Sequence, residues 1–349
     1  MIDLIGLPLP VTAAIFVVAA VVVWVAGARL ALIGDELSER YRLEKEFIGL
    51  VFLATVSKLP EIVTSVTAAR IENAGLVLGA LFGSISFNTA ILAVADYYIV
   101  RGALTSWPRN PNTALTAVML IVLLSALLAV TVSGDLALFG TLGLGGLALA
   151  LCFPVVIGLQ RANSRRASWA PVDLPDETRK GLMIRDRSKV GAQTTAILLI
   201  KTAVYATGIL AGGLALTYAA DAMALRTGMG ASFVGVTFLA IATSMPEFST
   251  TIASVRIGAY TMALANIFGS NLITMALIAP ADLAYERGAI LSDAGPAAQF
   301  SVAVGITVTA IYVAGILIRR TPSFFGAGLD SWLVMGVYLG SLAGLFFLA

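Results

Sequence analysis

Residues 47–71, FIGLVFLATVSKLPEIVTSVTAARI, and residues 233–257, FVGVTFLAIATSMPEFSTTIASVRI, are two copies of one pattern. Each is an apolar stretch long enough to cross a bilayer, and each carries a proline followed directly by a glutamate near its middle. A general richness in alanine and leucine does not explain why Pro60–Glu61 aligns with Pro246–Glu247. The pattern therefore indicates an internal repeat with a polar interruption inside a membrane helix.

The repeat continues without a gap, because LGALFGSISFNTAILAVAD at 78–96 aligns with LANIFGSNLITMALIAPAD at 264–282. Five predicted spans separate each element from its copy, and an odd number of crossings reverses the direction of the chain. The two halves are therefore expected to be inverted. Inverted repeats with interrupted helices near the bilayer midplane are typical of transporters. Asp96 and Asp282, near the ends of spans, are expected to act as interfacial anchors.

The composition is that of a polytopic membrane protein. The chain has 349 residues, 59% of them hydrophobic and 12% charged, and its mean hydropathy is +0.94. Soluble domains carry about 25% charged residues. The single cysteine, Cys152, excludes an internal disulfide, and no histidine is present, so proton chemistry must use carboxylates, lysine or water.

Apolar runs bounded by charged residues or by glycine and proline predict an all-α fold of ten spans in two inverted five-helix repeats. The predicted spans cover about 11–33, 47–70, 75–99, 113–133, 136–160, 193–219, 230–256, 260–281, 297–318 and 328–348. The first repeat is predicted over 1–160, a polar connecting loop over 161–192, and the second repeat over 193–349.

The distribution of basic residues predicts the orientation. With both termini outside, most arginines and lysines fall in cytoplasmic loops, including all those of 161–192, and the outside loops keep only Arg70, Arg226 and Arg287. The positive-inside rule favours this arrangement, which predicts a multi-pass protein of the cell (inner) membrane. Three further basic residues lie within predicted spans: Arg29, Lys58 and Lys201.

Pro60 and Pro246 have no N–H, so each leaves a carbonyl without its helical partner. Such carbonyls are tolerated at membrane depth only where something satisfies them. Carboxylates, hydroxyls and amides cluster around both prolines, and oxygen atoms of these types are the ligands that hard cations prefer. The candidate ion-binding residues are Glu61, Glu247, Ser57, Thr243, Ser244, Ser84, Ser270, Asn88, Asn271 and Thr274.

The stretch GVTFLAIATSMPEFSTT, followed by ANIFGSNLITM, resembles the second signature repeat of the sodium/calcium exchanger (calcium/cation antiporter) superfamily. Halves of that superfamily typically carry G-T-S-x-P-E and G-S-N motifs. The resemblance implies that Glu61 and Glu247 are the central calcium ligands and that the first and sixth spans slide past the rest. It also implies that hydroxyls complete the calcium and sodium positions, namely those of Thr243, Ser244, Ser57, Ser84 and Ser270.

The first repeat departs from the superfamily pattern. Ser57–Lys58 stands where Thr-Ser is usual, Val56 replaces a glycine, and Ala80 and Ile85 replace asparagines. In the second repeat, Thr274 stands where sodium exchangers usually have an acid or an asparagine. These changes remove oxygen ligands and add a positive charge, so they leave the fold prediction intact and the identity of the ions open.

Lys58 is expected to be a site residue. A charged lysine at the centre of a membrane helix costs at least ~2.5 kcal/mol, and Lys58 lies three residues before Glu61, where an ion pair is possible. A lysine snorkels best from a helix end, whereas Lys58 lies near the middle of its predicted span. Its ammonium replaces one sodium ion of the cycle, or loses its proton when a cation binds, or marks a site for a monovalent cation.

The predicted function is a secondary active antiporter that moves Ca²⁺ or a related cation, with Na⁺ or H⁺ as counter-ion, by alternating access at this site. The first alternative is a sodium-independent or proton-coupled cation exchanger, for divalent or monovalent ions, in which Lys58 replaces a bound cation. The further alternatives are a cation channel and a non-transporting membrane protein. An enzyme is disfavoured, because the chain has no histidine and therefore no H-E-x-x-H motif, and Cys152 has no evident partner. The expected partners are inorganic cations and the lipid bilayer, with no nucleic acid and no cofactor.

Overall fold

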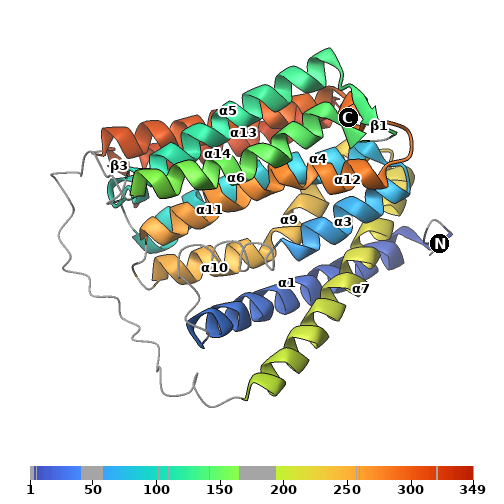
Figure 1. The fold of residues 1–349 in the computed structure, drawn as a ribbon, viewed down its shortest axis with the longest axis horizontal. Coiled ribbons are helices and arrows are strands. Elements are labelled where there is room, and N and C mark those ends of the chain that lie inside the picture. Colours follow the sequence, from blue (N-terminus) through green and yellow to red (C-terminus); the bar gives the residue numbers. More distant parts are fainter. Residues whose placement is uncertain are drawn as a thin grey trace.

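The computed structural model describes residues 4, 6–40, 58–100, 102–108, 111–140, 142–164, 194–256, 258, 260–319 and 321–348. This part of the chain is mostly helical (Figure 1). Seven of its helical segments are long and apolar enough to cross a membrane. They are α1 (Leu9–Arg40), α4 (Ala74–Ala95) with η2 (Asp96–Val100), α5 (Asn112–Ser133), α7 (Thr195–Thr227), α11 (Tyr260–Ala276) with α12 (Ile278–Ala284), α13 (Pro296–Ile318) and α14 (Leu329–Leu348).

Three further helical segments, together with the short 3-10 helices η3 (Leu104–Ser106) and η6 (Ile290–Asp293), complete the described bundle. α3 (Leu59–Arg70) is short, α6 (Leu144–Ser164) is an apolar helix, and a broken segment bends by 49° before α10 (Met245–Arg256). The part of this broken segment that precedes α10 consists of α8 (Ala231–Val234), η5 (Gly235–Leu239) and α9 (Ala240–Thr243). The predicted helical membrane class is confirmed. The number of ten spans stays a prediction, because much of the second one lies outside the described residues.

Two small hairpins add strands to the predicted all-α fold, and the first of them shortens a predicted span. The fifth span was predicted from residue 136, but β1 (Ala137–Phe139) pairs with β2 (Leu142–Gly143), and α6 begins only at Leu144. Gly134 and Gly140 have φ of 83° and 64°, a region that glycine enters without steric cost, and they turn the chain here. A second hairpin, β3 (Ser323–Phe324) with β4 (Ala327–Gly328), precedes α14. At its other end α6 continues four residues into the predicted connecting loop.

The prolines of the repeat explain where α3 and α10 begin. Pro60 lies in the first turn of α3, after Lys58 at the N-cap, and Pro246 is the second residue of α10, after a break at Ser244. Proline is accepted in a first turn because the N–H groups there have no helical partner. Each glutamate therefore follows directly at the start of a new helix.

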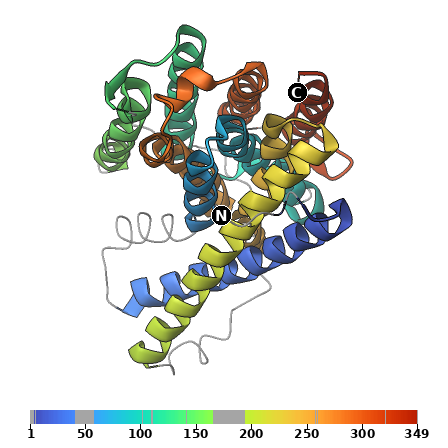
Figure 2. The same cartoon turned by 90° about the vertical axis from the view of Figure 1, so that its right-hand side faces the viewer.

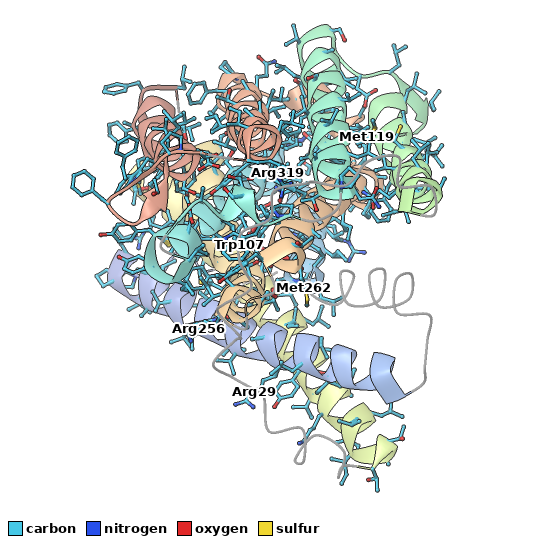
Figure 3. All side chains as sticks on the ribbon, turned by 90° about the vertical axis from the view of Figure 1, so that its left-hand side faces the viewer. Arg29, Trp107, Met119, Arg256, Met262 and Arg319 are labelled. Atoms are coloured by element: carbon cyan, nitrogen blue, oxygen red, sulfur yellow. The ribbon has the colours of Figure 1, made fainter. Side chains whose placement is uncertain are left out.

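The helices are arranged around α4, which is the most buried span (Figures 1 and 2). In the apolar 18-residue stretch of each span, 89% of the residues are buried for α4 with η2, against 28% for α1 and 22% for α7. α1 and α7 pack along each other at one side of the bundle and turn apolar side chains outward. Of the three basic residues predicted within spans, Arg29 is exposed and points away from the bundle (Figure 3), Lys201 is partly exposed, and only Lys58 is buried.

A close helix crossing fixes α4 against the broken segment. A Cβ atom on Gly79 would lie 2.6 Å from the carbonyl oxygen of Ser232, and one on Gly83 would lie 2.5 Å from that of Val236. Small residues four apart let membrane helices approach to backbone contact. The crossing therefore depends on these two glycines having no side chain.

Replacing Gly83 with alanine is expected to lower the thermal unfolding midpoint of the purified protein, because overpacking of this kind costs about 1–3 kcal/mol. Gly269 occupies the matching position of the second copy, and a Cβ there would meet nothing within 4 Å. Gly269→Ala is therefore the control and should leave the midpoint nearly unchanged. Equal midpoints for the two variants would contradict the crossing.

Asp96 and Asp282 are fully buried, so the expectation that they act as interfacial anchors was wrong. Each carboxylate accepts the backbone N–H of the residue eight positions later and that of a glycine at the end of a hairpin. The donors are Leu104 and Gly328 for Asp96, and Ile290 and Gly143 for Asp282, at 2.6–3.1 Å. The two aspartates hold the connecting segments at opposite ends of the bundle in the same way.

Candidate functional site

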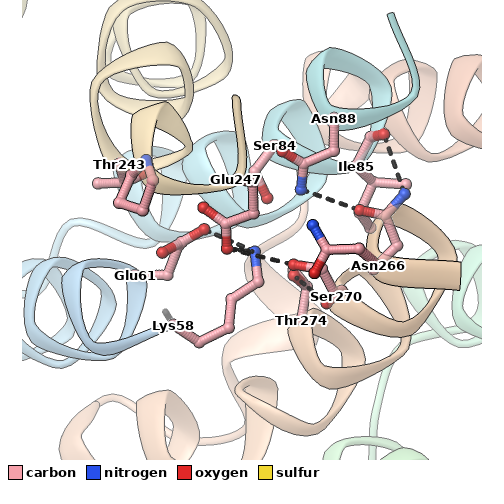
Figure 4. A network of polar contacts seen from close by, with 12 residues as sticks. Lys58, Glu61, Ser84, Ile85, Asn88, Thr243, Glu247, Asn266, Ser270 and Thr274 are labelled. Carbon is pink, nitrogen blue, oxygen red and sulfur yellow. Dashed lines mark hydrogen bonds and ion pairs between the residues drawn. The ribbon is translucent and has the colours of Figure 1, made fainter. Parts of the chain in front are cut away.

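The site centres on the ammonium of Lys58, which lies between two carboxylates (Figure 4). Its Nζ is 2.6 Å from Oε1 of Glu61 and 3.1 Å from Oε1 of Glu247. The exposed fractions of the three side chains are 0, 2 and 1%. The ion pair expected with Glu61 is present, and a second one joins the lysine to the other half of the chain.

Local structure accounts for this arrangement. Lys58 and Glu61 are three residues apart, so both side chains lie on one face of the start of α3. Glu61 and Glu247 each lie in the first turn of a helix, where the unpaired backbone N–H groups favour a negative charge. The two helix starts face one another, and Ser270 on α11 donates its hydroxyl to Oε1 of Glu247 at 3.2 Å.

Helices α4 and α11 are linked by an amide pair beside the carboxylates. Nδ2 of Asn88 donates to Oδ1 of Asn271 at 3.0 Å, and Nδ2 of Asn271 donates to the carbonyl oxygen of Ile85 at 3.2 Å (Figure 4). Both asparagines are fully buried. Because its amide nitrogen is engaged with Asn271, Asn88 has an amide oxygen free to accept.

The structure brings most of the predicted ion ligands together. Ser84, Ser270, Asn88, Thr243 and Thr274 surround the two glutamates in Figure 4. Three hydroxyls donate to carbonyls of their own helices and so present only oxygen lone pairs to the site; they belong to Thr243 (to Leu239, 3.0 Å), Ser84 (to Leu81, 2.8 Å) and Thr274 (to Ser270, 3.2 Å). Ser57 lies outside the described residues.

Sequence reasoning missed Asn266, whose amide nitrogen donates to the hydroxyls of Thr250 and Thr251 at 3.2 Å each. These bonds hold α11 against the second turn of α10, directly after Glu247. The signal was present in ANIFGSN, because Asn266 lies one helical turn before Ser270. The equivalent position in the first repeat is Ala80, so a comparison of the two copies does not mark Asn266 as a shared polar position.

A pocket of about 760 Å³ opens at the end of the bundle where α3 ends and α8 and α13 begin. Its rim carries an ion pair between Arg287 and Glu72, with an N–O distance of 2.8 Å, and a hydrogen bond from Tyr285 to Asp293. The hydrogen bond to Glu72 raises the pKa of Arg287, and burial together with Asp293 raises the pKa of Tyr285 to about 12. Both groups therefore stay protonated at neutral pH. Neither glutamate of the site lines this pocket.

A helical bundle of membrane-spanning length that buries two carboxylates and a lysine beside interrupted helices has the architecture of an ion transporter. The family model described as sodium/calcium exchanger protein matches residues 11–160 and 197–347. The chain therefore belongs to the sodium/calcium exchanger family. The resemblance found in the signature motifs is confirmed.

Two curated relatives are similar over most of their length. The chain is 28% identical over 264 residues to "Putative antiporter CaxA" of Alkalimonas amylolytica, a match that covers 75% of this chain and 77% of the relative. It is also 28% identical over 291 residues to "Inner membrane protein YrbG" of Escherichia coli (strain K12), covering 78% of this chain and 83% of the relative.

Solved structures with the same fold include native YfkE, with a TM-score of 0.66 at 15% identity over 95% of this chain and 92% of that one. The H+/Ca2+ exchanger CAX has a TM-score of 0.65 at 12% identity, and the match covers 97% of this chain and 86% of that one. The sodium-calcium exchanger NCX_Mj has a TM-score of 0.59 at 17% identity, and the match covers 96% of this chain and 99% of that one. At these identities the likeness establishes the fold alone.

Proposed function

We propose that the chain is a secondary active cation antiporter whose substrate site is built on Glu61 and Glu247, with Lys58 as a permanent cation of that site. The observation that carries the proposal is the ammonium held between the two Oε1 atoms in a place closed to solvent. An antiporter agrees with the name of the CaxA relative and with the exchangers that share the fold.

Alternating access in this proposal uses two inverted halves. Support comes from the family match in two segments on either side of residues 161–192, and from the matching roles of Asp96 and Asp282. α1 lies against α10 and α7 against α3, since a Cβ on Gly27 would lie 2.5 Å from Pro246, and one on Gly213 would lie 2.7 Å from Val63. Movement of α1 and α7 together therefore changes the access of both glutamates to either side of the membrane.

Electrostatics explains why the transport is an exchange. Two carboxylates and one ammonium leave a net charge of minus one in a buried position, and an uncompensated charge inside a membrane protein is costly. The site therefore changes its access from one side of the membrane to the other readily only when a cation is bound. Each transit in one direction then requires a cation for the return.

Reconstituted protein is expected to show saturable counterflow, because a closed site moves ions only by changing its access. Labelled cation on one side of a proteoliposome should move faster when a transportable cation is present on the other side. Sodium, potassium, calcium and protons are tested in turn. Flux that neither saturates nor responds to the opposite side would indicate a channel and end the proposal.

The proposed topology places both termini outside and the connecting loop in the cytoplasm. α1 begins and α14 ends at the same end of the molecule in Figure 1, which supports an even number of crossings. In a Cys152→Ser background, Ala170→Cys should react with an impermeant thiol reagent only from the cytoplasm. Glu286→Cys, at an exposed position of the opposite loops, should react only from outside. The reverse pattern would refute the orientation.

A further inference from the structure

The charge of the site is set by three side chains. Lys58 forms ion pairs with Glu61 and Glu247, and no other charged side chain in the described part of the chain forms an ion pair with any of the three. Among the described residues, no three or more histidine, cysteine, aspartate or glutamate side chains lie together in a group that could hold a metal ion. The protein side of the site therefore carries a net charge of minus one, whereas two carboxylates alone would carry minus two.

Four buried oxygen atoms of the candidate ion ligands accept no hydrogen bond from the described residues. They are Oε2 of Glu61, Oε2 of Glu247, Oδ1 of Asn88 and Oγ of Ser244. All four side chains are at least 98% buried, so bulk water does not satisfy them. Buried polar atoms are nearly always partnered in native proteins, and oxygen atoms of these kinds are ligands for hard cations.

The lysine and a transported ion therefore use different oxygens of the same carboxylates. The ammonium engages the two Oε1 atoms, which leaves both Oε2 atoms for a guest. Displacing the ammonium would break two charge-assisted contacts and leave a buried charge without a partner. Lys58 is fully buried in this conformation. It therefore stays in the site while the guest is bound.

We infer that the transported ion is a monovalent cation of the alkali-metal class, bound by the Oε2 atoms of Glu61 and Glu247 beside the ammonium of Lys58. The inference rests on the proposed function, because it names the substrate of the same site. A monovalent ion brings the buried site to neutrality, whereas a divalent ion would leave it positive. In this transporter the lysine converts a divalent cation site into a monovalent one.

The first test measures the thermal unfolding midpoint of the full-length protein in detergent with sodium, potassium or calcium chloride, with choline chloride to match ionic strength. Sodium or potassium should raise the midpoint in a saturable way, and calcium should not raise it beyond choline. Comparing the two alkali ions identifies the preferred size. Counterflow of the same ions in proteoliposomes should follow the same preference and, as a one-for-one exchange, should move no net charge.

A charge series makes the second test. Lys58→Met leaves two carboxylates and should shift the preference to calcium by at least about tenfold, since each unit of charge changes the Coulomb energy strongly at contact distance. Glu61→Gln leaves a neutral site and should lose the response to all cations. In the double variant Lys58→Met with Glu61→Gln the net charge of the site is again minus one, so the stabilisation by alkali cations should return. Lys201→Met, which removes a lysine from α7, is the matched control and should behave as the parent.

The outcomes separate the inference from the proposed function. If calcium stabilises the parent, alkali ions do not, and Glu247→Gln removes the calcium effect, the antiporter site stands and the monovalent assignment is wrong. If no cation gives counterflow, the proposed function fails and the inference fails with it. If Lys58→Met does not fold, the double variant still decides, because a folded double variant that ignores alkali ions would overturn the charge argument.

Discussion

Glu247→Gln is expected to abolish cation counterflow and to remove the cation-dependent rise in the unfolding midpoint. The substitution keeps the volume of the side chain but removes a buried carboxylate that contacts both Lys58 and Ser270. A Coulomb interaction at 4 Å is worth about 4 kcal/mol at an effective dielectric of 20 before desolvation is subtracted. A tenfold change in affinity corresponds to about 1.4 kcal/mol, so we expect at least about a tenfold loss of binding.

The same substitution leaves Lys58 paired with Glu61 alone, and the protein should still fold because the 2.6 Å contact within α3 remains. Glu286→Gln, at an exposed glutamate outside the site, serves as the control and should match the parent in both measurements. The readouts are isotope counterflow in proteoliposomes and the midpoint in detergent with and without cation. Binding and counterflow that match the parent in Glu247→Gln would remove this residue from the substrate site.

The local half of the site was predictable from sequence. The spacing of Lys58 and Glu61 within one helix, and the prolines that start α3 and α10, follow from helix geometry alone, and the structure has both features. The contact between Lys58 and Glu247 was not predictable in this way. It depends on how two segments far apart in the sequence pack, which no local pattern specifies.

The misses have a common physical cause. Asp96 and Asp282 were expected at the interface because they lie near span ends. Both accept backbone N–H groups of connecting segments, which carry no side-chain signature, and Asp96 also accepts the hydroxyl of Ser331, which is distant in sequence. The hairpin β1–β2 was read as the start of a span because its apolar residues suit either structure. Sequence patterns therefore located the polar residues well, and tertiary hydrogen bonds decided what those residues bind.

Ser244→Lys is expected to abolish cation binding and transport. Ser244 lies three residues before Glu247, as Lys58 does before Glu61, and the two residues share a backbone conformation, with φ and ψ of −88° and 5° against −87° and 1°. A lysine is therefore accommodated by the backbone at this break. Its ammonium would be a second positive charge beside the two carboxylates, and the resulting neutral site would no longer favour a cation.

Moving the lysine from one half to the other distinguishes an effect of its charge from steric blockage of the site by its side chain. In Lys58→Ser with Ser244→Lys the net charge returns to minus one, and because the halves are proposed to be inverted copies, the ammonium lies between the same carboxylates from the opposite side. Cation stabilisation and counterflow should return to within about tenfold of the parent, a difference of 1.4 kcal/mol. Ser244→Met adds a side chain of similar length without charge, so it measures the steric part. A folded double variant without any cation response, or a Ser244→Lys variant that transports like the parent, would show that the position of the lysine matters more than the charge it supplies.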